Sequence, residues 1–155
     1  MSSSAGNLTV GALAGYAASR TMDQATTWFY ARQTEASKRR EQEVAPGGML
    51  VQLGKQVGQA FGRNPSEEDA GRVGLAIHRT LGMSYGAIAA ALVRRGTRPL
   101  KAGLVVGAAA FVLVDEGTAI TQVTDFPPES HLRGIIGHAT FGVAAGLLLA
   151  LIDDD

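Results

Sequence analysis

Two long uninterrupted apolar runs constrain this chain more than any other feature. Residues 102–114 and 141–152 contain only apolar side chains and glycine. A surface helix of a soluble protein has a polar face, and neither run contains the polar positions that such a face needs. A helix that crosses the hydrocarbon core of a bilayer needs about 20 mainly apolar residues. With their flanks, the two runs reach this length at 100–123 and 132–152, and we expect both segments to span a membrane.

Two further segments are long enough to cross a bilayer but carry charges. They are residues 8–30, which contain Arg20 and Asp23, and residues 73–93, which contain His78 and Arg79. With the two apolar segments they predict an all-α fold, in which residues 1–155 form a single membrane domain with four transmembrane helices. The alternative is a soluble four-helix bundle, because an amphipathic soluble helix could explain the two charged segments.

The glycine content favours close helix packing in lipid. The chain has 20 Gly but only 5 Pro, so most glycines fall inside the expected helices. An interior glycine costs a soluble helix about 1 kcal/mol relative to alanine, whereas membrane helices use small residues for close contact. Small residues recur at every fourth position in the pairs Gly11 and Gly15, Gly82 and Gly86, Gly103 and Gly107, and in the series Gly134, His138, Gly142 and Gly146.

The first two expected spans are joined by a hydrophilic segment, residues 32–70. Within it, residues 49–61 carry the apolar side chains of Leu50, Leu53 and Val57 at helical spacing, which predicts a short amphipathic helix at the membrane interface. Residues 64–69 resemble a helix start, with acids where the helix dipole favours them.

The ionisable residues inside the spans fall at a similar depth. Because successive spans alternate in direction, positions late in the first and third spans lie level with positions early in the second and fourth. The residues concerned are Asp23, His78, Arg79, Asp115, Glu116 and His138, with Arg20 near the middle of the first span and with His131 and Arg133 at the adjacent interface. Buried charge is costly in lipid, so we expect these groups to face inward and pair.

Two functions are open for such a cluster. In the first, Asp23, Asp115, Glu116, His78 and His138 form an ion or proton site, with Arg20 and Arg79 as charge partners. Intramembrane ionisable groups often serve this purpose. In the second, the cluster only fixes the helices, and the chain is a non-catalytic membrane subunit or scaffold that docks on a larger complex. A bundle this small favours a homo-oligomer or a subunit of a complex.

No motif in the sequence indicates another class of function. The chain has no cysteine and its formal net charge is zero, which removes disulfides and thiolate metal sites and gives no reason to expect nucleic acid as a partner. The sequence contains no paired metal-ligand spacing, phosphate loop or nucleophile motif. We therefore expect no enzyme activity, no metal and no cofactor.

Two stretches resemble the YagU-like family of bacterial inner-membrane proteins, whose function is uncharacterised. They are residues 22–30, and residues 114–116 followed by 126–134 and the pair Gly137-His138. The resemblance implies a multi-pass protein of the bacterial inner membrane and implies no chemistry. The matching ionisable residues are Asp23, Asp115, Glu116, His131, Arg133 and His138.

Overall fold

The structure is a computed structural model that describes residues 4–116 and 125–153. The described part is helical and contains no strand, which confirms the predicted all-α class. Its elements are α1 (Ser4–Arg32), α2 (Glu35–Val44), α3 (Met49–Ala60), α4 (Glu67–Arg94), α5 (Pro99–Ala110), the π-helix η1 (Phe111–Glu116) and α6 (Pro128–Asp153).

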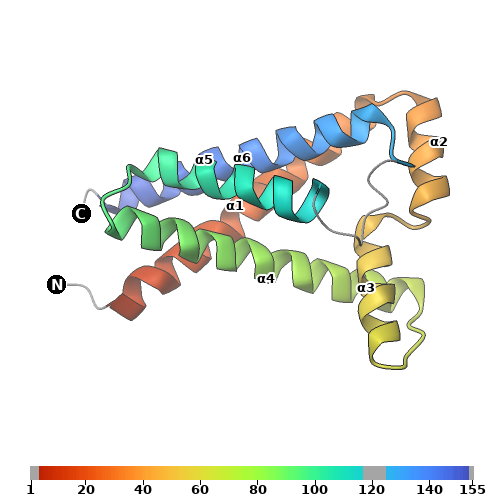
Figure 1. Cartoon of the computed structure of the whole chain (residues 1–155), viewed down its shortest axis with the longest axis horizontal. Coiled ribbons are helices and arrows are strands. Elements are labelled where there is room, and N and C mark those ends of the chain that lie inside the picture. The colour runs from red at the N-terminus through yellow and green to blue at the C-terminus, as the bar shows by residue number, and fades with distance from the viewer. Residues whose placement is uncertain (1–3, 117–124, 154–155) are drawn as a thin grey trace.

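The four long segments form an elongated bundle (Figure 1). Helices α1, α4, α5 with η1, and α6 lie lengthwise, while α2 and α3 lie across one end. We call this the α2/α3 end. The start of α1, the end of α6 and the turn between α4 and α5 lie at the opposite end. Successive long helices therefore run in alternating directions, as the sequence predicted.

The helix boundaries match the expected spans closely, with two differences. The third segment is α-helical only to Ala110 and continues as a π-helix to Glu116; its expected remainder, 117–123, lies outside the described residues. The hydrophilic segment holds two helices, whereas the sequence predicted one. The expected amphipathic helix is α3, and the missed helix α2 begins after Thr34, whose side chain accepts a hydrogen bond from the Ser37 N–H at 3.1 Å.

Local signals fix the ends of the bundle helices. The hydroxyl of Ser66 accepts a hydrogen bond from the Asp69 N–H at 3.1 Å and caps α4, which begins within the segment predicted as a helix start. In the turn between α4 and α5, Gly96 has a φ of 89°, a conformation that glycine adopts without steric cost. Pro99 then starts α5, where its missing N–H leaves no bond unmade.

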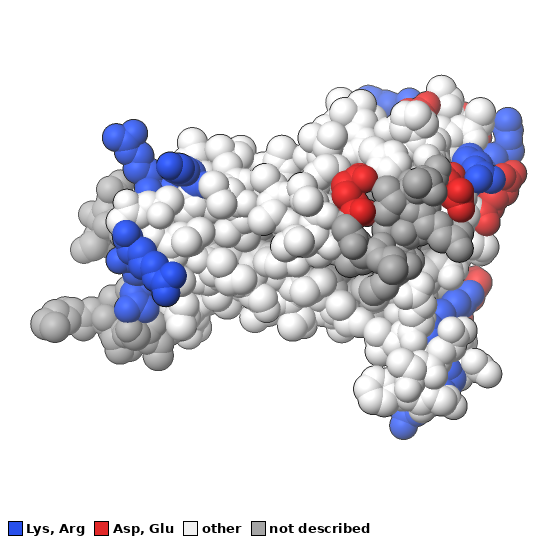
Figure 2. Space-filling model, in the orientation of Figure 1, with Lys and Arg blue, Asp and Glu red and all other residues white. Residues whose placement is uncertain are grey.

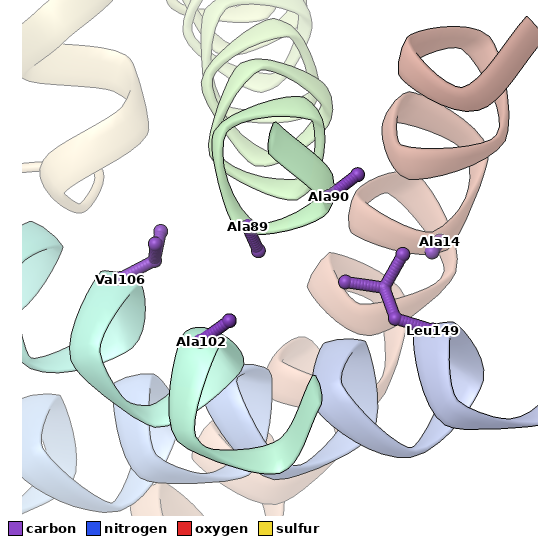
Figure 3. Packing of buried hydrophobic residues seen from close by; sticks show 6 residues of the cluster. All are labelled: Ala14, Ala89, Ala90, Ala102, Val106 and Leu149. Atoms are coloured by element: carbon purple, nitrogen blue, oxygen red, sulfur yellow. The ribbon is translucent and has the colours of Figure 1, made fainter. Parts of the chain in front are cut away.

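The core of the bundle is built from small side chains (Figure 3). Its largest buried cluster consists of Ala14, Ala89, Ala90, Ala102, Val106 and Leu149. Large apolar side chains instead lie on the outside of the helices, including Leu13, Ile88, Leu104, Leu113 and Leu147. This distribution reverses the usual one of a soluble domain, in which large aliphatic side chains are most often buried.

The predicted glycine pairs lie where the long helices touch. A Cβ atom on Gly86 of α4 would lie 2.2 Å from the carbonyl oxygen of Gly11 in α1. A Cβ atom on Gly103 of α5 would lie 2.2 Å from the carbonyl oxygen of Gly142 in α6. Both contacts involve backbone atoms, so any side chain would force the helices apart.

One described helix, α6, is long and apolar enough over Pro128–Ile152 to cross a membrane by length and composition. Helices α1 and α4 contain internal charged residues, and α5 has only 12 residues before the π-helix begins.

Candidate functional site

Asp23 links α1 to α4 through two neighbouring residues of α4. One oxygen of its carboxylate lies 3.1 Å from His78 Nε2, and the other accepts a hydrogen bond from the Arg79 guanidinium. Arg79 also donates to the hydroxyl of Ser19 at 2.9 Å, and Ser19 is almost completely buried. The Arg79 side chain is only 14% exposed, so this charge is held between the two helices.

A second group of contacts joins η1 to α6. The Asp115 carboxylate lies 3.4 Å from His138 Nε2, and the Glu116 carboxylate lies 2.7 Å from His131 Nδ1. Both acids belong to the π-helix. π-helical turns within longer helices occur frequently at functional sites, and here the segment presents two consecutive acids to two histidines of one neighbouring helix.

His138 is the most deeply placed histidine of the site. The residue is 8% exposed, and its ring lies 5.9 Å from the ring of Phe111. Its Nδ1 atom is buried and has no hydrogen-bond partner among the described residues. Helix α6 approaches η1 closely beside this ring. Gly134, one turn earlier, permits the approach, because a side chain there would collide with Asp115 Oδ2 and Phe111.

Tyr85 of α4 packs against α6. Its ring lies edge-on to Phe141 at 6.4 Å between centroids. It also borders the buried cluster of Ala18, Phe141 and Ala145. Tyr85 therefore joins α4, which carries His78 and Arg79, to the helix that carries His138.

A buried polar network at the α2/α3 end was missed by the sequence interpretation. Arg133 donates to Gln33 Oε1 at 2.7 Å and to Glu41 Oε2 at 2.8 Å. Glu41 also accepts hydrogen bonds from Gln33 at 2.7 Å and from Ser130 at 2.6 Å. Glu41 is 7% exposed. Glu41 lies one turn after Ser37 on the same face of α2, and this polar four-residue spacing was the available signal.

The structure brings together most of the predicted site residues but not all of them. The expected pairing of Arg79 with an acid is present, whereas Arg20 makes no ion pair with a described residue. Arg20 is exposed and lines a groove on the surface of α1, to which α4 contributes Arg79. His131 and Arg133, predicted at the interface before the fourth span, lie inside the first two turns of α6, which begins at Pro128.

The site offers acid–base chemistry rather than a clustered set of metal ligands. Within the ranges that the structure describes, no three His, Cys, Asp or Glu side chains are grouped so that they could hold a metal ion. The carboxylates instead face imidazole or guanidinium groups across a helix contact: Asp23 faces one of each, and Asp115 and Glu116 face one imidazole each. No family model, curated protein or solved structure matches this chain.

Proposed function

We propose that this chain is a small multi-pass membrane protein in which four helices cross the bilayer and acid–histidine pairs between them move protons or a small cation. The reversed distribution of apolar side chains supports the membrane placement. Lipid tails solvate Leu, Ile and Val on the outside, while small residues allow close helix contact inside. In water, these large apolar side chains would be exposed to solvent without a partner.

The distribution of charge supports the same placement (Figure 2). On the face shown, Lys and Arg gather at one end and charges of both signs gather at the α2/α3 end. An acidic patch lies inward of the α2/α3 end, and the surface between this patch and the first end carries no charge. The turn between α4 and α5 lies at this first end, and Arg94, Arg95, Arg98 and Lys101 lie in the turn or beside it. Charged ends around an uncharged band are expected of a bundle whose middle lies in hydrocarbon.

One observation carries the proposed activity: all three histidines of the chain contact a carboxylate on another element. The pairs are His78 with Asp23, His131 with Glu116 and His138 with Asp115. An imidazole gains or loses a proton near neutral pH, and an adjacent carboxylate stabilises the protonated form. Chains of Asp, Glu and His inside membranes serve as proton relays. The three pairs lie in the half of the bundle nearer the α2/α3 end.

The second candidate remains a non-catalytic membrane subunit or scaffold. The buried network of Glu41, Arg133 and Gln33 favours it, because a fully paired network fixes α2 against α6 without a proton-accepting group left over. The bacterial inner membrane is the proposed location under either function, and membership of the YagU-like family is likewise a proposal that rests on the motifs quoted above.

Flux measurement in proteoliposomes tests the proposed activity. A potassium diffusion potential would drive protons inward, with an internal pH-sensitive dye as the readout, and parallel assays would replace protons with Na⁺ or K⁺. We expect flux from the wild-type chain and at least a tenfold loss in Asp115→Asn. Asp125→Asn is the matched control, because Asp125 is exposed and belongs to none of the three acid–histidine pairs.

The two functions give different results in this experiment. Loss of flux in an Asp115→Asn protein that keeps its thermal stability supports a pathway. A wild-type chain that conducts no cation overturns the activity. If Asp115→Asn is also unstable in detergent, the pairs brace the fold, and the subunit function takes precedence.

A further inference from the structure

One outward face of α1 differs in composition from the other exposed faces of the bundle. It carries Ala17, Arg20, Gln24, Thr27 and Ala31, all of which are exposed. The exposed faces of α5 and α6 carry mainly large apolar side chains, among them Leu104, Val105, Val143 and Leu147. Lipid tails suit the second kind of surface and not the first.

The polar part of this face is a groove. Five residues of α1 and one of α4 line an open volume of about 460 Å³; they are Arg20, Asp23, Gln24, Thr27, Trp28 and Arg79. The Asp23 carboxylate reaches the groove with 38% of its side chain exposed. The groove thus holds one acid and two guanidiniums, of which Arg79 is already paired with Asp23 while Arg20 has no ionic partner among the described residues.

The depth of Arg20 makes an open groove costly in a membrane. Arg20 lies twelve residues before Arg32, the last residue of α1, which is about 18 Å along a helix. Half of a hydrocarbon core is about 15 Å, so Arg20 lies near the midplane. An arginine at this depth on a lipid-facing surface costs about 3 kcal/mol on the insertion scale. The groove therefore requires a protein surface over it.

We propose that a second copy of this chain covers the groove, with the two α1 helices parallel and related by a two-fold axis along the bundle. The five exposed residues are separated by steps of three, four, three and four. This average of 3.5 residues is the spacing of a seam between two parallel helices. Small residues at the ends of the seam, Ala17 and Ala31, permit a close approach.

Charge complementarity selects a second copy as the occupant. Each copy presents one unpaired cation, Arg20, and one half-exposed carboxylate, Asp23, about 4.5 Å apart along the same helix. In a parallel pair the two Arg20 residues lie at the same level, and each guanidinium extends about 4.5 Å along the axis to Asp23 of the other copy. Each carboxylate oxygen already accepts one contact, from His78 or Arg79, and can accept another. The Gln24 amides meet across the axis, where each supplies a donor and an acceptor.

The proposed pair encloses the two grooves against each other. The proposal depends on the membrane placement in the proposed function, but not on proton transfer. The dimer also forms a polar space that both copies share, and this space includes the Asp23–Arg79 ion pair of each copy.

The absence of cysteine from the chain permits a direct test. Thr27→Cys places a single thiol on the seam, and residues on such a seam approach closely enough for a disulfide. Oxidation of this variant with copper phenanthroline in native membranes is expected to yield a product of twice the chain mass. Ile135→Cys is the matched control, because Ile135 is 49% exposed on α6 and lies off the proposed seam.

A second variant tests the charge pairing. Arg20→Leu, added to Thr27→Cys, is expected to lower the cross-linked fraction at least fivefold, even though leucine suits lipid better than arginine. Equal cross-linking of Thr27→Cys and Ile135→Cys overturns the interface, as does a product whose mass is not twice that of the chain. Undiminished cross-linking in the Arg20→Leu variant overturns the pairing of Arg20 with Asp23.

The same samples separate the two proposals. Protein that stays in the carbonate-washed membrane pellet without a Thr27→Cys cross-link overturns the interface alone. Protein that leaves the pellet overturns the membrane placement and the interface with it.

Discussion

Asp115 and His138 face each other across the contact between the π-helix and α6, with 3.4 Å between the carboxylate Oδ2 and His138 Nε2. The distance exceeds that of an ordinary hydrogen bond and contrasts with the 2.7 Å between Glu116 and His131. The Asp115 side chain is 37% exposed and that of His138 only 10%. The pair therefore joins an accessible carboxylate to a buried imidazole, as a proton pathway requires.

Replacing His138 with phenylalanine should separate packing from proton transfer. Phenylalanine keeps the ring beside Phe111 and removes the buried Nδ1 that lacks a partner, so we expect thermal stability in detergent to be retained. Proton flux in proteoliposomes should fall at least tenfold, because the imidazole is lost. Flux equal to that of the wild-type chain would remove His138 from the pathway.

The glycine contact between α1 and α4 should tolerate no side chain. In Gly86→Ala the new Cβ meets the Gly11 carbonyl oxygen at 2.2 Å and the Gly15 Cα at 2.5 Å. The helices must separate, and we expect a loss of about 1–3 kcal/mol in unfolding free energy. Thermal or denaturant unfolding in detergent measures it.

Gly71→Ala is the matched control in the same helix. A Cβ at Gly71 would lie 3.6 Å from the nearest atom, a methyl group of Val51, which is ordinary van der Waals contact. Alanine should therefore leave stability unchanged or raise it by up to about 1 kcal/mol through helix propensity. Equal effects of the two substitutions would contradict the close α1–α4 packing.

The Arg133–Glu41 pair should be needed to attach α2 to the bundle. Arg133→Met leaves Glu41, 7% exposed, without its cation, and breaking a buried pair costs about 3–5 kcal/mol. Adding Glu41→Gln should recover part of the loss, because the amide is uncharged. Limited proteolysis and thermal unfolding provide the readouts.

The control for this pair is Arg40→Met. Arg40 pairs with Glu43 at 3.2 Å and donates to the backbone oxygen of Asp125 at 3.1 Å. Both side chains of the pair are about half exposed or more, at 48% and 66%, and such surface contacts contribute about 0–1 kcal/mol each. A double variant no more stable than Arg133→Met alone would show that the two residues do not act on each other.

The sequence predicted the parts of the fold that depend on hydrophobicity and on glycine spacing. The limits of α1, α4 and α6 followed from apolar length, and the contacts of Gly86 and Gly103 followed from the four-residue repeat. Matching depth predicted that ionisable groups of neighbouring helices pair, because both helices pass through the same layer in opposite directions. It did not predict which acid Arg79 contacts, and the structure gives Asp23.

Helix α2 could not be found by the same reasoning, because its buried face is polar. Ser37 and Glu41 are buried there by hydrogen bonds to Gln33 and Arg133, and no hydrophobic stripe marks that face. The direction of Arg20 was missed for a related reason. Its depth follows from its position along α1, but the rotation of α1 about its axis is set by the glycine contact with α4.

The outward-facing leucines provide the clearest test of the membrane placement. Leu147 of α6 is 53% exposed and lies in the uninterrupted apolar run. In water, Leu147→Arg would be nearly neutral, since surface substitutions usually change stability by less than about 0.5 kcal/mol. In hydrocarbon, the same change costs about 3 kcal/mol on the insertion scale.

We therefore expect the fraction of Leu147→Arg in carbonate-washed membranes to fall several-fold. Gln59→Arg, at an exposed position of α3 outside the proposed spans, should leave that fraction unchanged. If both variants behave like the wild-type chain, the outer surface of α6 does not face lipid, and the reversed apolar distribution requires a different explanation.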